Sequence, residues 1–215
     1  MKITITKDKY MRRLSAIILA SALMFVTPSA QAVPDKAIKV HNIDVGQGSA
    51  TLIQTMNGKN ILVDTGWDFA GDRLNHYLKK IGVKKLDAMV ISHRHMDHIG
   101  AVKNVAEKFA VDKLIGPWSK EAIPTSVMAH VGHLRKDMTK PHSPKNRPAY
   151  ETAVTGKVFN FGGGFQMETL WPKVHASGKA IADYNEESVA MRVTQNIPGK
   201  TGAKAKAASF LVGGD

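Results

Sequence analysis

Four side chains with metal-binding chemistry stand close together in the run S-H-R-H-M-D-H, at residues 92–98. They are His93, His95, Asp97 and His98, and they follow directly on a short apolar segment. Imidazole and carboxylate groups together suit Zn²⁺ or Mn²⁺. A loop of this spacing can turn two histidines toward one ion and an aspartate with a histidine toward a second. The pattern therefore predicts a centre of two divalent ions, although histidines can also serve purely structural roles.

Composition limits what else the chain can use. It has no cysteine, so a disulfide scaffold, a thiolate metal site and a cysteine nucleophile are all excluded. Any metal must be held by His, Asp or Glu. With 215 residues, 43% of them hydrophobic, the chain has room for one domain with a real core and a leader.

The elements around the loop predict a mixed sheet covered by helices, which is an α/β fold. Residues 50–55 and 60–65 read as two strands, and Asn57-Gly58 between them favours a hairpin. A helix is expected after Asp72, which is a candidate N-cap, with Gly82 as its end. A buried strand over 86–91 leads into the loop. The remaining expected elements are a helix over 99–109 and strands over 38–45, 111–115, 157–161, 165–171, 188–194 and 207–212.

The first 32 residues have the pattern of a secretory signal peptide. Basic residues precede an apolar run over 14–26, and Ala30-Gln31-Ala32 forms an A-x-A cleavage site. Cleavage there predicts a secreted or periplasmic protein, with residues 33–215 as its domain and no stable membrane association afterwards. An uncleaved membrane anchor is the alternative.

The overall charge balance is basic. The chain has a formal net charge of +12, and 33–215 alone contain 25 basic and 17 acidic residues. Such a surface favours anionic partners such as nucleic acid, anionic lipid or phosphate esters, but it also serves solubility alone. A Pro-rich basic loop over 140–148 can meet substrate phosphates or simply be solvated.

H-x-H-x-D-H is also the signature of the metallo-β-lactamase superfamily, which the chain resembles. Further similarity links it to the hydrolase domain of the ComEC competence proteins. That similarity covers roughly 38–215 and is carried by short motifs, namely DVGQG (44–48), NGKNILVDTG (57–66), LKKIGVKKLDAMVISHRHMDHIGA (78–101) and FLVGGD (210–215). The resemblance implies an αβ/βα sandwich with its metals at one edge.

By this resemblance, His93 and His95 hold one ion, and Asp97 and His98 hold the other. Asp97 is the candidate catalytic residue, because it would bind metal and orient the attacking hydroxide. Asp215 matches a bridging aspartate. Asp64 matches an acidic position behind the metal loop that orients ligands, though a turn carboxylate is an alternative for it.

The resemblance implies a phosphodiester substrate, with nucleic acid first. A phosphocholine-esterase-like or β-lactamase activity is the alternative, as is a remnant without turnover. Glu186 and Glu187 depart from the family pattern, which tends to have Asn there. The family's His-His-Gly-Ser motif follows the bridging aspartate, so a domain incomplete at its C-terminus is expected. The missing ligand could then be one of four other histidines, His130, His133, His142 and His175.

Overall fold

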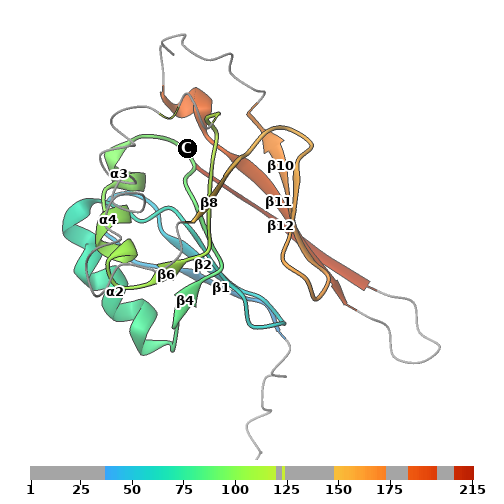
Figure 1. Ribbon diagram of the computed structural model, residues 1–215, viewed down its shortest axis with the longest axis horizontal. Helices are drawn as coiled ribbons and strands as arrows, with labels where there is room; N and C mark the ends of the chain where they lie inside the picture. Colours follow the sequence, from blue (N-terminus) through green and yellow to red (C-terminus); the bar gives the residue numbers. More distant parts are fainter. Residues whose placement is uncertain (1–36, 120–122, 124–147, 173–183, 198–205) are drawn as a thin grey trace, which may run out of the picture. The chain divides into compact units, whose positions relative to one another are not determined.

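The computed structural model describes residues 37–119, 123, 148–172, 184–197 and 206–215. Residues 36–215 form one compact unit. In chain order (Figure 1) its elements are β1 (Lys39–Asn42), β2 (Thr51–Gln54), β3 (Asn60–Val63), η1 (Asp68–Ala70), α2 (Gly71–Lys80), β4 (Lys85–Leu86), β5 (Ala88–Val90), α3 (Met96–Ile99), α4 (Val102–Ala106), β6 (Ala110–Val111), β7 (Lys113–Gly116), β8 (Ala149–Thr152), β9 (Val158–Asn160), β10 (Phe165–Trp171), η2 (Tyr184–Glu187), β11 (Ala190–Ile197) and β12 (Lys206–Gly213). The signal-peptide segment, the basic loop and the four additional histidines lie outside the described residues.

Two main sheets organise this unit, as the family resemblance implied. The first has the strand order β1-β2-β3-β5-β7-β8, and the second has the order β12-β11-β10-β9. Strands β1, β2 and β3 pair antiparallel, whereas β3, β5, β7 and β8 run parallel. The four strands of the second sheet are all antiparallel.

Each buried strand of the first sheet divides its side chains between two cores. In β5, Met89 joins the core that includes the helices, while Ala88 and Val90 join the core shared with the second sheet. Strand side chains alternate between faces, so an unbroken apolar strand must be covered on both sides. Phe159 and Phe165 of the second sheet fill the inter-sheet core and are almost completely buried. The layers are therefore helices, first sheet and second sheet. Within the described part of the chain, the α-helices contribute to the first core only.

The hairpin at Asn57-Gly58 is confirmed, with β2 and β3 paired on either side. Only Gly58 takes a positive φ, of 80°. This turn also contacts the connection between β9 and β10 in the second sheet, because Asn57 Nδ2 donates to the Phe161 carbonyl at 3.0 Å.

Three local predictions need correction. Asp72 lies inside the first turn of α2 rather than at its N-cap, where its charge still favours the helix N-terminus. The single helix expected over 99–109 is two short helices: α3 begins before the predicted start, and α4 lies within the predicted range. Strand β8 was not predicted, and it pairs parallel with β7.

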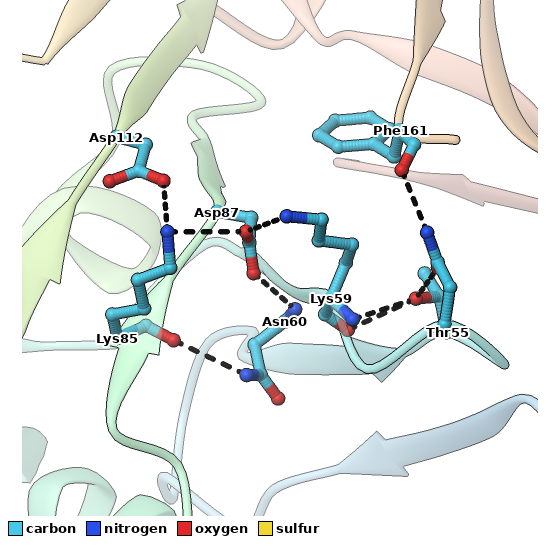
Figure 2. Close-up of polar contacts among 8 residues, drawn as sticks. Thr55, Lys59, Asn60, Lys85, Asp87, Asp112 and Phe161 are labelled. Atoms are coloured by element: carbon cyan, nitrogen blue, oxygen red, sulfur yellow. Dashed lines mark hydrogen bonds and ion pairs between the residues drawn. The ribbon is translucent and has the colours of Figure 1, made fainter. Parts of the chain in front are cut away.

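The strand predicted over 86–91 is interrupted at Asp87, and Figure 2 shows why. One Asp87 oxygen accepts a hydrogen bond from Lys59 Nζ at 2.8 Å, and the other accepts one from the Asn60 N–H at 2.9 Å. Lys85 Nζ lies 3.6 Å from the same carboxylate and also pairs with Asp112. Burial opposes ionisation, but these donors outweigh it and lower the pKa of Asp87. The cluster thereby joins the starts of β3, β5 and β7 in a fixed register.

No helix among the described residues is long and apolar enough to cross a membrane.

Candidate metal centre

The predicted site residues come together where parallel strands of the first sheet end. Asp64 directly follows β3, and residues 92–98, called the metal loop from here on, follow β5 after one residue. Because β3 and β5 are parallel neighbours, these two ends lie at the same sheet edge. Asp215 arrives from the second sheet, where β12 pairs with β11 and the Gly214 N–H donates to the Val189 carbonyl. Val189 in turn donates its N–H to the Ser92 carbonyl at 3.0 Å.

Three of the predicted ligands form one cluster. His93, His98 and Asp215 each present a ligand atom within 4.8 Å of the others. The His93 and His98 rings have centroids 4.1 Å apart, and both side chains are buried. His98 Nε2 lies 3.4 Å from an oxygen of Asp215, so the C-terminus lies beside α3 (Figure 1).

His95 and Asp97 lie at the margin of this cluster. His95 Nδ1 is 3.0 Å from His93 Nε2, with the two rings nearly perpendicular. An Asp97 oxygen is 3.9 Å from His98 Nε2. The predicted division into a His93–His95 pair and an Asp97–His98 pair thus corresponds to two neighbouring contacts, and Asp215 stands on the His98 side.

The donor set fits a divalent ion. Two imidazole nitrogens on one tetrahedral Zn²⁺, each about 2.0 Å from the ion, stand about 3.3 Å apart. His93 Nε2 and His95 Nδ1 are already near that separation, at 3.0 Å. The buried His93 and His98 stand beside two carboxylates, those of Asp97 and Asp215. Together they offer the mixed nitrogen and oxygen ligands that Zn²⁺ and Mn²⁺ accept. His93, His95, Asp97, His98 and Asp215 are therefore the residues that would hold the metal.

Asp64 lies behind the cluster and is fully buried. One of its oxygens accepts from the Ser92 N–H at 2.8 Å. The other lies 2.6 Å from the Ser92 hydroxyl and 2.8 Å from His98 Nδ1. A carboxylate can only accept, so Nδ1 carries a proton, and in the neutral form of the ring Nε2 is then the unprotonated nitrogen that faces Asp215. This contact would let Asp64 orient His98 as a metal ligand, the role that the resemblance implies for it.

The backbone at Asp64 takes a left-handed conformation, with φ of 57°. Non-glycine residues seldom do so, although Asp and Asn tolerate it best. The carboxylate's three hydrogen-bonding partners hold that conformation in place, so the turn and the site are built together.

Electrostatics distinguish the two buried histidines. Burial lowers the pKa of His93, and the nearby His98 and His95 lower it further. Burial also works against protonation of His98, but the hydrogen bond and the charge of Asp64, then the charges of Asp215 and Asp97, raise its pKa. His93 is therefore a neutral donor near pH 7. His98 holds a proton more readily, which a bound cation would displace.

The turn at Gly46-Gln47-Gly48 supports the loop from the other side. Gly48 has φ of 106°, and a side chain there would place its Cβ 2.0 Å from the Asp97 carbonyl oxygen. The Ser49 N–H donates to that same carbonyl at 3.1 Å. This close approach requires glycine at position 48.

Sequence reasoning assigned no role to three residues that hold the loop. The Ser92 hydroxyl bridges Asp64 and His93 Nδ1, which are 2.6 and 3.0 Å from it. Glu187 pairs with Arg94 and accepts from the Trp118 indole. The position of Ser92 inside the motif was a usable signal. Nothing in the local sequence links Glu187 or Trp118 to the loop, because the contacts span 93 and 69 residues.

Comparison with known proteins decides the family. The model of the metallo-beta-lactamase superfamily matches residues 43–191. The chain belongs to this superfamily. This membership makes the chain a metallo-hydrolase by family. It also confirms the predicted mixed α/β fold with several sheets.

Individual relatives of this superfamily chain match parts of it. "Recombination protein 2" of Haemophilus influenzae is 37% identical over 87 residues, which is 38% of this chain and 11% of that protein. "Probable metallo-hydrolase YqgX" of Bacillus subtilis is 29% identical over 119 residues, covering 55% of this chain and 52% of that protein. A solved structure of metallo-beta-lactamase SMB-1 bound to 2-mercaptoethanesulfonate has 19% identity and a TM-score of 0.45, over 80% of this chain and 60% of its own. The chain thus spans from a tenth to about half of the curated relatives it matches here.

Proposed function

We propose that this chain is a metal-dependent phosphodiesterase that acts on nucleic acid. The observation that carries the hydrolase part is the cluster of two buried histidines, His93 and His98, with the more exposed Asp215, and with Asp64 behind it. A buried histidine hydrogen-bonded to a carboxylate, next to further carboxylates, is the arrangement of metal ligands with an orienting partner.

The residues divide the work as follows. His93, His95, Asp97, His98 and Asp215 bind two divalent ions, Zn²⁺ or Mn²⁺. When bound, such ions make water more acidic and stabilise charge on the attacking and leaving oxygens. Asp64 keeps the proton of His98 on Nδ1, which leaves the Nε2 lone pair free to bind a metal ion. Asp97, partly exposed at the start of α3, can accept a hydrogen bond from an incoming water and orient it.

Two features support a phosphodiester substrate. Residues 33–215 contain 25 basic and 17 acidic residues, and this excess of positive charge favours polyanions. The relative from Haemophilus influenzae is named a recombination protein, and recombination acts on DNA. A phosphocholine-esterase-like activity, a β-lactamase activity and a fold without turnover are the competing outcomes.

A substrate panel separates these functions. The full chain would be assayed with Mn²⁺ or Zn²⁺ on single-stranded DNA, bis-p-nitrophenyl phosphate and nitrocefin, beside His98→Ala and His76→Ala. His76 is an exposed histidine of α2 and serves as the matched control. We expect hydrolysis of both phosphodiesters, its loss in His98→Ala only, and no reaction with nitrocefin. Cleavage of nitrocefin alone would refute the phosphodiester proposal, and inactivity on the whole panel would favour the remnant.

We further propose export, on the strength of the apolar run over 14–26 and the site at Ala30-Gln31-Ala32. N-terminal sequencing of protein recovered outside the cytoplasm should begin at Val33. An intact leader in the membrane fraction would indicate an anchor instead.

A further inference from the structure

Arg94 stands between two predicted metal ligands, His93 and His95, and its side chain takes part in a buried ion pair. Its Nε donates to Glu187 Oε2 at 2.9 Å, and a terminal nitrogen donates to Oε1. The pair is therefore bidentate, the geometry in which guanidinium and carboxylate hold each other most firmly. Only 17% of the Arg94 side chain and 2% of the Glu187 side chain are exposed.

Glu187 has a second fixed partner. The Trp118 indole N–H donates to Glu187 Oε2 at 2.9 Å, and Trp118 is itself buried. Trp118 follows β7, whose neighbour β5 leads into the metal loop. Glu187 of η2 thus joins the segment after β5, through Arg94, to the segment after β7, through Trp118. Trp118 is held in its turn, because Tyr150 Oη donates to the Trp118 carbonyl at 2.8 Å.

The conformation of the metal loop explains how the Arg94–Glu187 contact can affect the positions of His93 and His95. His95 has an extended backbone, with φ of −66° and ψ of 144°. The contact between His93 Nε2 and His95 Nδ1 shows that these two rings do share a side, while Arg94 reaches Glu187. Holding Arg94 therefore restrains the residues on both sides of it.

We propose that Glu187 is a positioning residue for the metal centre: held by Trp118, it fixes Arg94 and so sets the directions in which His93 and His95 present their nitrogens to a metal ion. This inference rests on the proposed metal-dependent function. It gives Glu187 of η2, which is 93 residues from Arg94 in the sequence, the role of orienting His93 and His95 before the metal binds.

A purely structural ion pair is the competing explanation, and it makes a different prediction. Breaking a buried pair lowers the stability of the fold whether or not metal is present. A positioning pair changes metal affinity in addition, because the ligands must then be ordered when the ion binds. Loss of an orienting partner typically weakens metal binding by about 10- to 100-fold.

The test measures Zn²⁺ affinity by competition with a chromophoric chelator, and thermal unfolding of the metal-free full chain, for each variant. Glu187→Gln should weaken Zn²⁺ binding by about 10- to 100-fold, and Glu187→Asp, which keeps the charge, should recover part of the loss. Arg94→Lys keeps a cation but not the bidentate geometry, so it should also lose affinity. Glu168→Gln is the matched control, because it breaks a more exposed Glu168–Arg192 pair in the second sheet and should leave the affinity unchanged.

A double variant covers the case in which Glu187→Gln fails to fold. Arg94→Met with Glu187→Met removes both charges while keeping apolar packing, a replacement that buried pairs often tolerate. This double variant should fold, and its Zn²⁺ affinity should remain below that of the wild type. Wild-type affinity in that double variant, or unchanged affinity in a destabilised Glu187→Gln, would overturn the positioning role. If the wild-type chain and every variant bind Zn²⁺ with the same high affinity, the positioning role of Glu187 is wrong, and the proposed metal-dependent function is unaffected. A wild-type chain that binds neither Zn²⁺ nor Mn²⁺ would overturn both.

Discussion

Replacing Asp64 with asparagine should weaken metal binding by moving a proton on His98. Asparagine has the same shape and also tolerates the left-handed backbone at this position, where φ is 57°. Its amide oxygen can keep the hydrogen bond from the Ser92 N–H. Its NH₂ group must then face His98 Nδ1, where the wild-type carboxylate accepts at 2.8 Å. Two donors cannot pair, so the imidazole proton moves to Nε2, the nitrogen that faces Asp215.

The magnitude follows from what metal binding must then undo. To present a free Nε2, His98 has to return its proton to Nδ1 and leave a buried donor facing the amide NH₂. Losing a buried hydrogen bond to a charged group costs about 1.5–3 kcal/mol. At 1.4 kcal/mol for each tenfold change in affinity, Zn²⁺ should bind about 10- to 150-fold more weakly. The metal-free fold should lose a similar free energy of unfolding, because one charge-assisted bond disappears.

The assay is chelator competition for Zn²⁺ affinity, with NMR of the imidazole nitrogens to identify the protonated nitrogen of His98. Asp112→Asn is the control, since it makes the same substitution at a half-exposed carboxylate just before β7, at the opposite ends of the strands from the metal loop. If Asp64→Asn binds Zn²⁺ with wild-type affinity, or if its His98 keeps the proton on Nδ1, the reasoning about the tautomer is wrong.

Two further perturbations test the support of the site. Gly48→Ala should destabilise the fold and reduce metal binding more than Gly46→Ala, because both sites have positive φ but only the first places a Cβ against the Asp97 carbonyl; equal effects in chemical denaturation and in Zn²⁺ titration would show that backbone strain alone matters. Asp87→Ala should cost about 2 kcal/mol at pH 7, since it removes a buried carboxylate that accepts hydrogen bonds from a lysine and a backbone amide. The folded-state pKa of Asp87 is lowered, so its contribution is present above the unfolded value of about 3.9 and fades as the pH falls through the folded-state value. Urea unfolding at neutral and at strongly acidic pH should therefore show the difference from wild type shrinking, and a constant difference would contradict this assignment.

The ligand motif and the family could be recognised from sequence because their information is local. His93, His95, Asp97 and His98 lie within one short loop, and ligand spacing of that kind needs no knowledge of distant contacts. The hairpin at 57–58 was equally predictable, since positive φ at glycine is a property of the residue itself. Boundaries were less certain: the break at Asp87 depends on Lys59 and Asn60, which pair with it only in the folded sheet.

Sequence alone therefore determined the types of metal ligand, their spacing and the apolar strands that the fold buries. The tertiary structure decided what holds them: Asp64 oriented on His98, Asp215 brought in by the second sheet, and Glu187 locked on Arg94. These contacts join residues 34 to 117 positions apart. Burial in a low-dielectric interior strengthens those of Asp64 and Glu187, whereas Asp215 is more exposed. No local pattern encodes which carboxylate will be buried against which cation, because that pairing exists only once both sheets have packed.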